Sequence, residues 1–188
     1  MSLEVVLGPM FSGKSSYIHH LVHRYKALDI PILVIKPDID KRYTKDACLV
    51  THDQLKVPCV MWDTHTMLQK LRMDVPDKLV IIEEAQFFRG LVEFVKHLVD
   101  EERRDVVIVG LDGDWRRKPF PEILDCIPLA DKVTKLHALC KRCRDGTPGL
   151  FTHRLSNDTA QVSVGGPEAY EPLCRSCFLT ATGGSARD

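Results

Sequence analysis

The feature that most constrains this chain is an octapeptide with the pattern G-x-x-x-x-G-K-[ST], formed by Gly8, Pro9, Met10, Phe11, Ser12, Gly13, Lys14 and Ser15. An apolar run precedes it, and a helical pattern follows with one apolar face: Ile18, Leu21, Val22, Tyr25 and Leu28. Strand, glycine loop and helix in this order are the context that a phosphate-binding P-loop requires. Backbone N–H groups and the helix N-terminus would hold the phosphates, with Lys14 on the β- and γ-phosphates and Ser15 on Mg²⁺. A chance match in a glycine-containing turn is the alternative.

Length and composition favour one globular domain with a small appendage. The chain has 188 residues, of which 44% are hydrophobic and 28% are charged, enough to bury a core. A formal net charge of zero argues against a basic surface for nucleic acid or anionic membrane. The first strand starts almost at once and no apolar run approaches ~20 residues, so we expect no signal peptide and no membrane span. Seven cysteines, an odd number, argue against a pure disulfide framework and indicate a reducing, cytoplasmic location.

Apolar runs alternate with helical patterns over the first 137 residues. Buried parallel strands are predicted at 31–37, 78–84, 106–111 and 132–136, with a shorter strand at 57–62 and helices at 64–71 and 91–99. Residues 38–52 are polar and are predicted to form a loop, either a solvated excursion or a functional segment. The alternation predicts an α/β fold of the P-loop NTPase type, a parallel sheet with helices on both faces.

Two strand ends carry polar residues that are candidates for chemistry. Glu83 and Glu84 end the strand at 78–84, where a Walker B acid would hold the Mg²⁺ water shell and a second acid would accept a proton. Paired glutamates at a strand end also arise by chance. Residues 112–115 form a turn signal at the sheet edge where α/β folds bind ligands. The basic cluster at 116–118 is interpreted as a solvated face.

The last fifty residues change character, because two C-x-x-C pairs have the spacing of a four-cysteine zinc site: Cys140, Cys143, Cys174 and Cys177. A redox pair or two disulfides are the alternatives. The remaining cysteines, the nearby His137 and the histidines at 19, 20 and 23 are interpreted as spectators. Between the pairs, Gln161–Gly166 is strand-like and then glycine-rich, and Tyr170 follows. A flexible segment held at both ends is well placed to fold over a ligand.

A set of short motifs runs in order over residues 3–178: Gly8–Ser15, Asp40-x-Arg42-Tyr43, Thr51-His52-Asp53, Glu84-x-Gln86-Phe87-Phe88, Leu111-Asp112-Gly113, Arg117-Lys118-Pro119-Phe120, the four cysteines and Val164-Gly165-Gly166-x₃-Tyr170. This set resembles the type II thymidine kinases, the family of the cytosolic vertebrate enzyme. P-loops occur in hundreds of families, but the combination with this cysteine arrangement and the segment between the pairs is specific.

The resemblance implies ATP-dependent phosphorylation of the 5′-hydroxyl of thymidine, and usually of deoxyuridine, with Mg²⁺ and a structural Zn²⁺. It places the catalytic base at Glu84. It also implies feedback inhibition by dTTP and a homotetramer, and it implies neither nucleic-acid nor membrane partners.

The resemblance further assigns ATP and Mg²⁺ binding to the P-loop residues with Asp40, Lys41, Arg42, Glu83 and Gln86. It assigns nucleoside binding to Met10, Phe87, Leu111, Trp115, Phe120, Thr152, Gln161, Val162, Ser163, Val164, Gly165 and Tyr170, of which residues 161–165 would offer backbone groups to the pyrimidine edge.

Three positions depart from the family pattern. The family usually has Asp where this chain has Glu83, which changes the geometry at the metal. Trp115 replaces a Phe or Tyr, and Ser163 takes a place that is often apolar. The expected division is a nucleotide-binding domain at 1–137, a zinc-binding domain at 138–180 and a disordered tail at 181–188.

Two other functions remain open on the sequence. A P-loop ATPase with a zinc ribbon that acts on nucleic acid is opposed by the zero net charge and the short chain. A nucleotide-binding relic without turnover is suggested by Glu83.

Overall fold

The computed structural model describes residues 1–38, 48–50, 56–65, 67, 69, 78–163 and 165–183, with only the backbone for 48–50 and 56. Most of the polar segment at 38–52 and half of the predicted helix at 64–71 lie outside this part of the chain, as do four predicted site residues: Asp40, Lys41, Arg42 and Val164. Within the described residues, helices that are both long and apolar enough to cross a membrane are absent.

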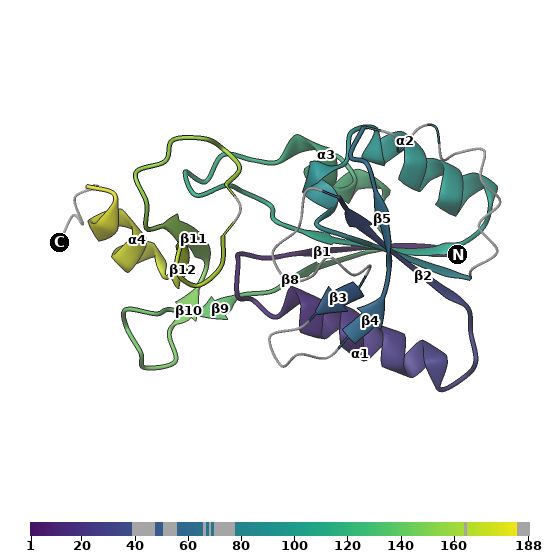
Figure 1. Cartoon of the computed structure of the whole chain (residues 1–188), viewed down its shortest axis with the longest axis horizontal. Coiled ribbons are helices and arrows are strands. Elements are labelled where there is room, and N and C mark those ends of the chain that lie inside the picture. The colour runs from purple at the N-terminus through teal and green to yellow at the C-terminus, as the bar shows by residue number, and fades with distance from the viewer. Residues whose placement is uncertain are drawn as a thin grey trace.

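A six-stranded sheet forms the first part of the chain, and every neighbouring pair of its strands is parallel (Figure 1). Its strands, from edge to edge, are β5 (Val60–Trp62), β2 (Ile32–Pro37), β6 (Leu79–Glu83), β7 (Asp105–Gly110), β1 (Ser2–Leu7) and β8 (Lys132–Lys135). The central strands are buried on both faces, which explains why they read as continuous apolar runs. The predicted parallel sheet is confirmed.

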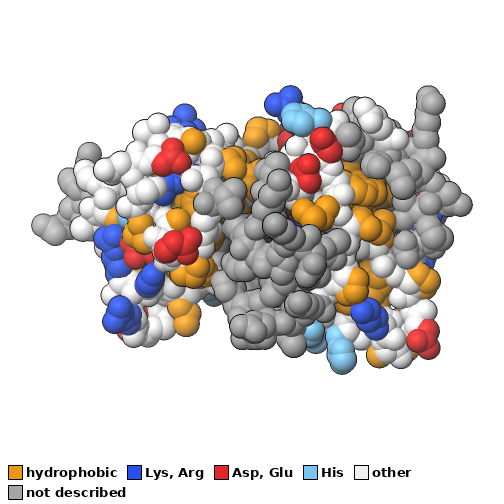
Figure 2. All heavy atoms as spheres, viewed as in Figure 1, with side chains coloured by type: hydrophobic (Ala, Val, Ile, Leu, Met, Phe, Trp, Pro, Cys, Tyr) orange, Lys and Arg blue, Asp and Glu red, His pale blue; other side chains and the backbone are white. Residues whose placement is uncertain are grey.

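Helices cover both faces of this sheet, as predicted (Figure 1). On one face, α1 (Lys14–Lys26) buries Ile18, Leu21 and Val22 against the sheet. The other face carries α2 (Leu91–Lys96), its continuation η3 (His97–Glu101), α3 (Pro121–Leu124) and the short turns η2 (Ala85–Phe87) and η4 (Ile127–Leu129). The core on that face is larger and contains Phe88, Phe94 and Trp62. On the face drawn in Figure 2, acidic and basic side chains are interspersed over the described surface.

Three local predictions were wrong. The run at 57–62 is two strands, because Pro58, which has no N–H to donate, ends β4 (Lys56–Pro58) before β5 begins. Part of the predicted loop is the strand β3 (Cys48–Val50), which pairs antiparallel with β4. Helix α1 ends at Lys26, so Leu28 is not on its apolar face and is 72% exposed.

A smaller unit follows β8 and lies beyond the carboxyl ends of the strands (Figure 1). It contains two short antiparallel pairs and a helix: β9 (Ala138–Leu139) with β10 (Pro148–Gly149), β11 (Phe151–Arg154) with β12 (Tyr170–Leu173), and α4 (Arg175–Ala181). Its buried core consists of Cys140, Leu173, Cys174 and Phe178. Helix α4 reaches Ala181, one residue into the predicted tail, and residues 184–188 lie outside the described chain.

Candidate active site

The glycine loop runs from β1 to α1 at the carboxyl edge of the sheet, and its conformation requires glycine at two positions. A Cβ on Gly8 would lie 2.6 Å from the Ser12 hydroxyl and 2.9 Å from the Leu136 carbonyl oxygen. Gly13, which precedes α1, has a φ of 82°, a conformation that other residues adopt at a cost. The Ser12 hydroxyl is buried without a hydrogen-bond partner in the described structure. A glycine loop at a helix N-terminus with a buried, unsatisfied hydroxyl fits a bound anion.

The two residues that close the P-loop motif make different contacts. The Lys14 ammonium donates to the carbonyl oxygens of Gly8 at 3.1 Å and Pro9 at 2.8 Å, so it lies over the loop. The Ser15 hydroxyl donates to a carboxylate oxygen of Glu83 at 3.0 Å. Glu83 ends β6 and is buried, and its longer side chain still reaches the serine. A hydroxyl and a carboxylate side by side are the hard oxygen ligands that Mg²⁺ prefers, so these residues fit that ion.

Glu84 comes directly after β6 and is held in an unusual backbone conformation. Its φ is 49°, in the left-handed region that non-glycine residues rarely occupy and that clusters at functional sites. The Gln86 amide nitrogen donates to one Glu84 carboxylate oxygen at 2.7 Å, and the Gln86 amide oxygen accepts from the Leu111 N–H at 3.0 Å. Gln86 therefore ties the ends of β6 and β7 together and orients Glu84, which sequence reasoning did not foresee.

Gly110, the last residue of β7, makes room for this arrangement. A Cβ there would lie 2.2 Å from the Gln86 amide oxygen and 2.9 Å from Ile123. The close approach of the Gln86 side chain to the β7 backbone thus depends on a position without a side chain.

A cavity opens beside Glu84, and it is lined from both parts of the molecule. It contains about 580 Å³ of empty space, including the part open to solvent. Its lining residues come from positions far apart in the sequence: Met10, Glu84, Phe87, Leu111, Gly113, Asp114, Trp115, Phe120, Thr152, Arg154, Gln161, Val162, Ser163 and Tyr170. All but two of the twelve residues predicted to bind nucleoside are among them. Gly165 is described but is not in this lining, and Val164 lies outside the described residues.

Two contacts shape the cavity wall on the side of the sheet. Phe87 and Phe120 meet edge to face with ring centroids 6.2 Å apart, so this part of the wall is aromatic and apolar. The Met10 N–H of the P-loop donates to the Thr152 hydroxyl on β11 at 3.0 Å. This second contact ties the phosphate-binding loop directly to the smaller unit.

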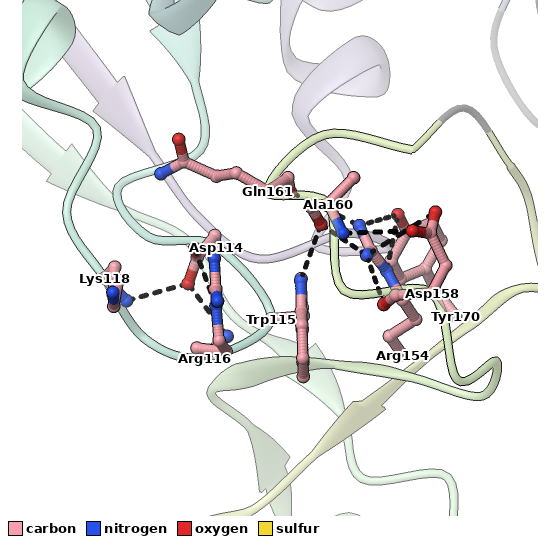
Figure 3. Close-up of polar contacts among 9 residues, drawn as sticks. All are labelled: Asp114, Trp115, Arg116, Lys118, Arg154, Asp158, Ala160, Gln161 and Tyr170. Carbon is pink, nitrogen blue, oxygen red and sulfur yellow. Dashed lines mark hydrogen bonds and ion pairs between the residues drawn. The ribbon is translucent and has the colours of Figure 1, made fainter.

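The turn after β7 is built around the buried carboxylate of Asp114. One of its oxygens accepts from the backbone N–H groups of Arg116 and Lys118, each at 2.8 Å (Figure 3). These bonds hold Trp115 at the rim of the cavity. Arg116, Arg117 and Lys118 have exposed side chains, consistent with a solvated face.

We call residues 155–163 the arm; it forms the remaining wall. The arm has no helix or strand of its own, and side chains from elsewhere hold its backbone. The Tyr170 hydroxyl donates to the Ser163 carbonyl at 2.7 Å, and the Trp115 indole N–H donates to the Ala160 carbonyl at 3.1 Å. Arg154 also donates hydrogen bonds to carbonyl oxygens of the arm. The sequence did not single it out, because one basic residue in a short strand forms no motif.

The four paired cysteines come together as predicted for a metal site. Their sulfur atoms all lie within 4.8 Å of one another, and Cys143 Sγ is 3.7 Å from Cys174 Sγ and 3.6 Å from Cys177 Sγ. A tetrahedral Zn²⁺ with Zn–S bonds of ~2.3 Å requires sulfur atoms about 3.8 Å apart. The set therefore fits Zn²⁺. In the described structure none of the four forms a disulfide.

The residues interpreted as spectators lie away from this cluster. His137 is exposed and is not part of the cysteine group, and His20 and His23 are exposed on α1. Cys59 and Cys126 are buried in the large unit. Burial, reinforced by the nearby negative charge of Glu122, raises the pKa of the Cys126 thiol to about 12, so it remains protonated.

Comparison with known proteins agrees with this geometry. The family model described as thymidine kinase matches residues 1–178. Thymidine kinase a of Arabidopsis thaliana is 38% identical over 182 residues, covering 95% of this chain and 75% of that protein. A thymidine kinase of Oryza sativa subsp. japonica is 39% identical over 181 residues, with 94% and 66% covered, and that of variola virus is 36% identical over 178 residues, with 94% and 96% covered.

A solved structure, a genome packaging NTPase of Sulfolobus turreted icosahedral virus 2, aligns with a TM-score of 0.44 at 16% identity, over 77% of this chain and 76% of that chain. A likeness at that level supports no conclusion about function. The family match and the relatives are sufficient: the chain belongs to the thymidine kinase family.

Proposed function

We propose that this protein transfers the γ-phosphoryl group of ATP to the 5′-hydroxyl of thymidine, and of deoxyuridine, in pyrimidine salvage. The observation that carries the proposal is that Glu84 lines the same cavity as the aromatic side chains and borders the P-loop through Met10. A carboxylate, an apolar aromatic wall and a phosphate-binding loop around one space are the groups that a nucleoside kinase needs.

The nucleoside would lie with its pyrimidine against Phe87, Leu111 and Phe120, and with its edge toward the arm. Backbone groups at residues 161–165 would bind the polar edge of the base, with Tyr170 holding the segment in place. Recognition by backbone groups explains how Ser163 can replace an apolar residue without changing the base preference.

The triphosphate would bind to the backbone of residues 8–15. Lys14 would exchange the carbonyl oxygens it contacts for phosphate oxygens, and Asp40, Lys41 and Arg42 would lie near the phosphates. Ser15 and Glu83 would hold Mg²⁺, with Gln86 in the segment beside it. The ion, when bound, neutralises charge on the β- and γ-phosphates.

Glu84 is proposed as the general base. As the 5′-oxygen bonds to the γ-phosphorus and ADP departs, the hydroxyl proton passes to the Glu84 carboxylate. The hydrogen bond from Gln86 to one of its oxygens orients the carboxylate, which lines the cavity where the nucleoside would bind. A positioned base of this kind contributes about 10²–10⁴-fold to the rate.

The smaller unit is proposed as a structural domain at 138–180, held by Zn²⁺ on the four cysteines, beside a nucleotide-binding domain at 1–137. From the family resemblance we also propose that the protein is a cytoplasmic homotetramer and that dTTP inhibits it. Retention of full activity in millimolar dTTP would contradict the proposed inhibition.

The test is phosphate transfer from ATP to thymidine, deoxyuridine and deoxycytidine by the purified protein with Mg²⁺. Transfer to the first two nucleosides and not to the third is the expected result. Binding of ATP and thymidine without transfer would overturn catalysis and point to a binding protein, with the extra methylene of Glu83 as the first suspect. Failure to bind thymidine would overturn the proposed substrate.

A further inference from the structure

Arg154 is a buried cation on the wall of the cavity. It ends β11, and antiparallel pairing sets it opposite Tyr170 on β12. Alternation along β11 directs Thr152 and Arg154 to the cavity, whereas Phe151 and His153 contact Phe178 on the other side. The Arg154 side chain is only 1% exposed. A guanidinium so far from water is stable only when other groups replace its hydration.

The groups that replace it are mostly carbonyl oxygens of the arm. Arg154 Nη1 donates to the Asp158 carbonyl at 2.9 Å and to the Ala160 carbonyl at 2.5 Å, and Nη2 donates to the Gln161 carbonyl at 3.3 Å (Figure 3). Nη2 and Nε also donate to the Tyr170 hydroxyl, at 2.9 and 3.2 Å. One side chain thus fixes three peptide groups of a segment that has no regular structure.

Aromatic faces cover the guanidinium where carbonyl groups do not. Its central carbon lies 5.0 Å from the centre of the Trp115 ring and 5.4 Å from that of the Tyr170 ring. Trp115 also donates to the same Ala160 carbonyl that Arg154 binds (Figure 3). Two elements on opposite sides of the cavity, the turn after β7 and strand β11, therefore meet at one peptide group of the arm.

A carboxylate has only a small share in balancing this charge. The Asp158 carboxylate is 3.8 Å from Nη1 and is 44% exposed, so solvent screens the pair. Peptide dipoles and ring faces provide the rest. A planar fork with five N–H groups can serve three carbonyls, a hydroxyl and two rings at once, whereas a lysine ammonium cannot.

We propose that Arg154 is a positioning residue that sets the affinity for the nucleoside by holding the arm backbone, residues 158–163, against Trp115. The inference rests on the proposed function for the identity of the ligand. Arg154 acts through the arm, so its loss weakens nucleoside binding and leaves the P-loop and the zinc cluster unchanged.

The first test is Arg154→Lys, with KM measured separately for thymidine and for ATP. Lysine keeps the charge but not the fork. We expect the thymidine KM to rise about 10- to 100-fold, because several hydrogen bonds to a charged group are lost. The ATP KM, the zinc content and kcat are expected to stay within about threefold.

Arg175→Lys is the matched control. Arg175 is exposed in the same unit, and its guanidinium lies 5.0 Å from the Phe151 ring, away from the arm. We expect its thymidine KM to equal that of the unmodified protein. An equal rise in both variants, or an Arg154→Lys protein with unchanged thymidine KM, would overturn the inference.

A second variant, Trp115→Phe, covers the case in which Arg154→Lys fails to fold. Phenylalanine keeps a ring beside Arg154 but is smaller and lacks the N–H bonded to Ala160, so we expect a rise of about 2- to 10-fold in thymidine KM. An unchanged thymidine KM in this variant would show that the hydrogen bond from Trp115 to the Ala160 carbonyl does not contribute to nucleoside affinity.

Amide hydrogen exchange without any substrate separates this inference from the proposed function. Faster exchange at residues 158–163 in Arg154→Lys, with unchanged exchange in the glycine loop, is the expected result whatever nucleoside the protein binds. Unchanged exchange in the arm would overturn the role of Arg154 even if thymidine is phosphorylated. Failure of the unmodified protein to phosphorylate thymidine would overturn the proposed function instead.

Discussion

The two parts of the molecule are stabilised in different ways. The large unit is a six-stranded parallel sheet with an apolar cluster on each face, so its stability is spread over many residues. The small unit has strands of two to four residues and a buried core of four residues, two of them cysteines. It depends on a few side chains: the sulfur cluster, Arg154 on the arm, and the pair of Arg142 with buried Glu171 at 2.7 Å. The cavity between the two units is therefore lined on one side by a sheet with an extensive core and on the other by a segment that a few side chains hold.

Cys140→Ser should produce the largest effect, because a unit with so small a core relies on its metal. Structural zinc sites supply about 10–16 kcal/mol of apparent binding free energy in zinc-finger peptides. We expect the variant to lose its zinc, measured by atomic spectroscopy, and to lose activity by about 100-fold or more as the arm loses its support.

The control is Cys126→Ala, which removes a buried thiol from the large unit. It should keep its zinc and lose only about 1 kcal/mol of stability. Unchanged zinc content in Cys140→Ser would show that the cysteines do not hold the metal and that the small unit is not stabilised by them.

Glu84→Gln should produce the next largest effect and should leave both units folded. Glutamine keeps the size of the side chain and removes the proton acceptor. We expect kcat to fall about 10²- to 10⁴-fold, while the dissociation constants of thymidine and ATP stay nearly constant. Glu93→Gln, an exposed change on α2, is the matched control. Near-normal turnover in Glu84→Gln would exclude this carboxylate as the base.

Gly110→Ala tests how tightly the large unit constrains the site. The added methyl would collide with Gln86, so we expect a loss of about 1–3 kcal/mol in the free energy of unfolding. Because Gln86 orients Glu84, kcat should fall by about 10- to 100-fold. In the double variant with Gln86→Ala, the loss of stability should be smaller than the sum of the two single losses. If the two losses simply add, the new methyl group does not collide with Gln86.

Glu83→Asp should have the smallest effect. The shorter acid withdraws from Ser15 and frees its hydroxyl for the ion, so the Mg²⁺ concentration that gives half-maximal rate should fall by up to about tenfold. Glu83→Gln, which loses the charge, should raise that concentration. An identical dependence of the rate on Mg²⁺ concentration in the unmodified protein and both variants would show that Glu83 does not hold the ion.

Sequence patterns predicted the elements that depend on neighbouring residues. The glycine loop, the apolar strands and the two cysteine pairs are local, since each consists of residue types at short, fixed spacing. Family resemblance added the pocket residues, and the structure gathers ten of them around one cavity with Glu84. Two of the wrong predictions, at the end of α1 and in the run at 57–62, concern boundaries, where one proline or one missing contact decides. The third, strand β3 within the predicted loop, forms by pairing with β4, which the polar composition of the loop does not reveal.

The sequence by itself determined the phosphate loop, the sheet type and the four-cysteine cluster, because each is encoded in a short stretch with a strong backbone or ligand preference. Only the tertiary structure decided how Glu84 is oriented and how the arm is held. Gln86, Gly110 with Trp115, and Arg154 come from three separate segments of the chain, and their contacts exist only after the sheet and the small unit have packed together. A short pattern cannot encode a contact whose partners are chosen by the packing of distant elements.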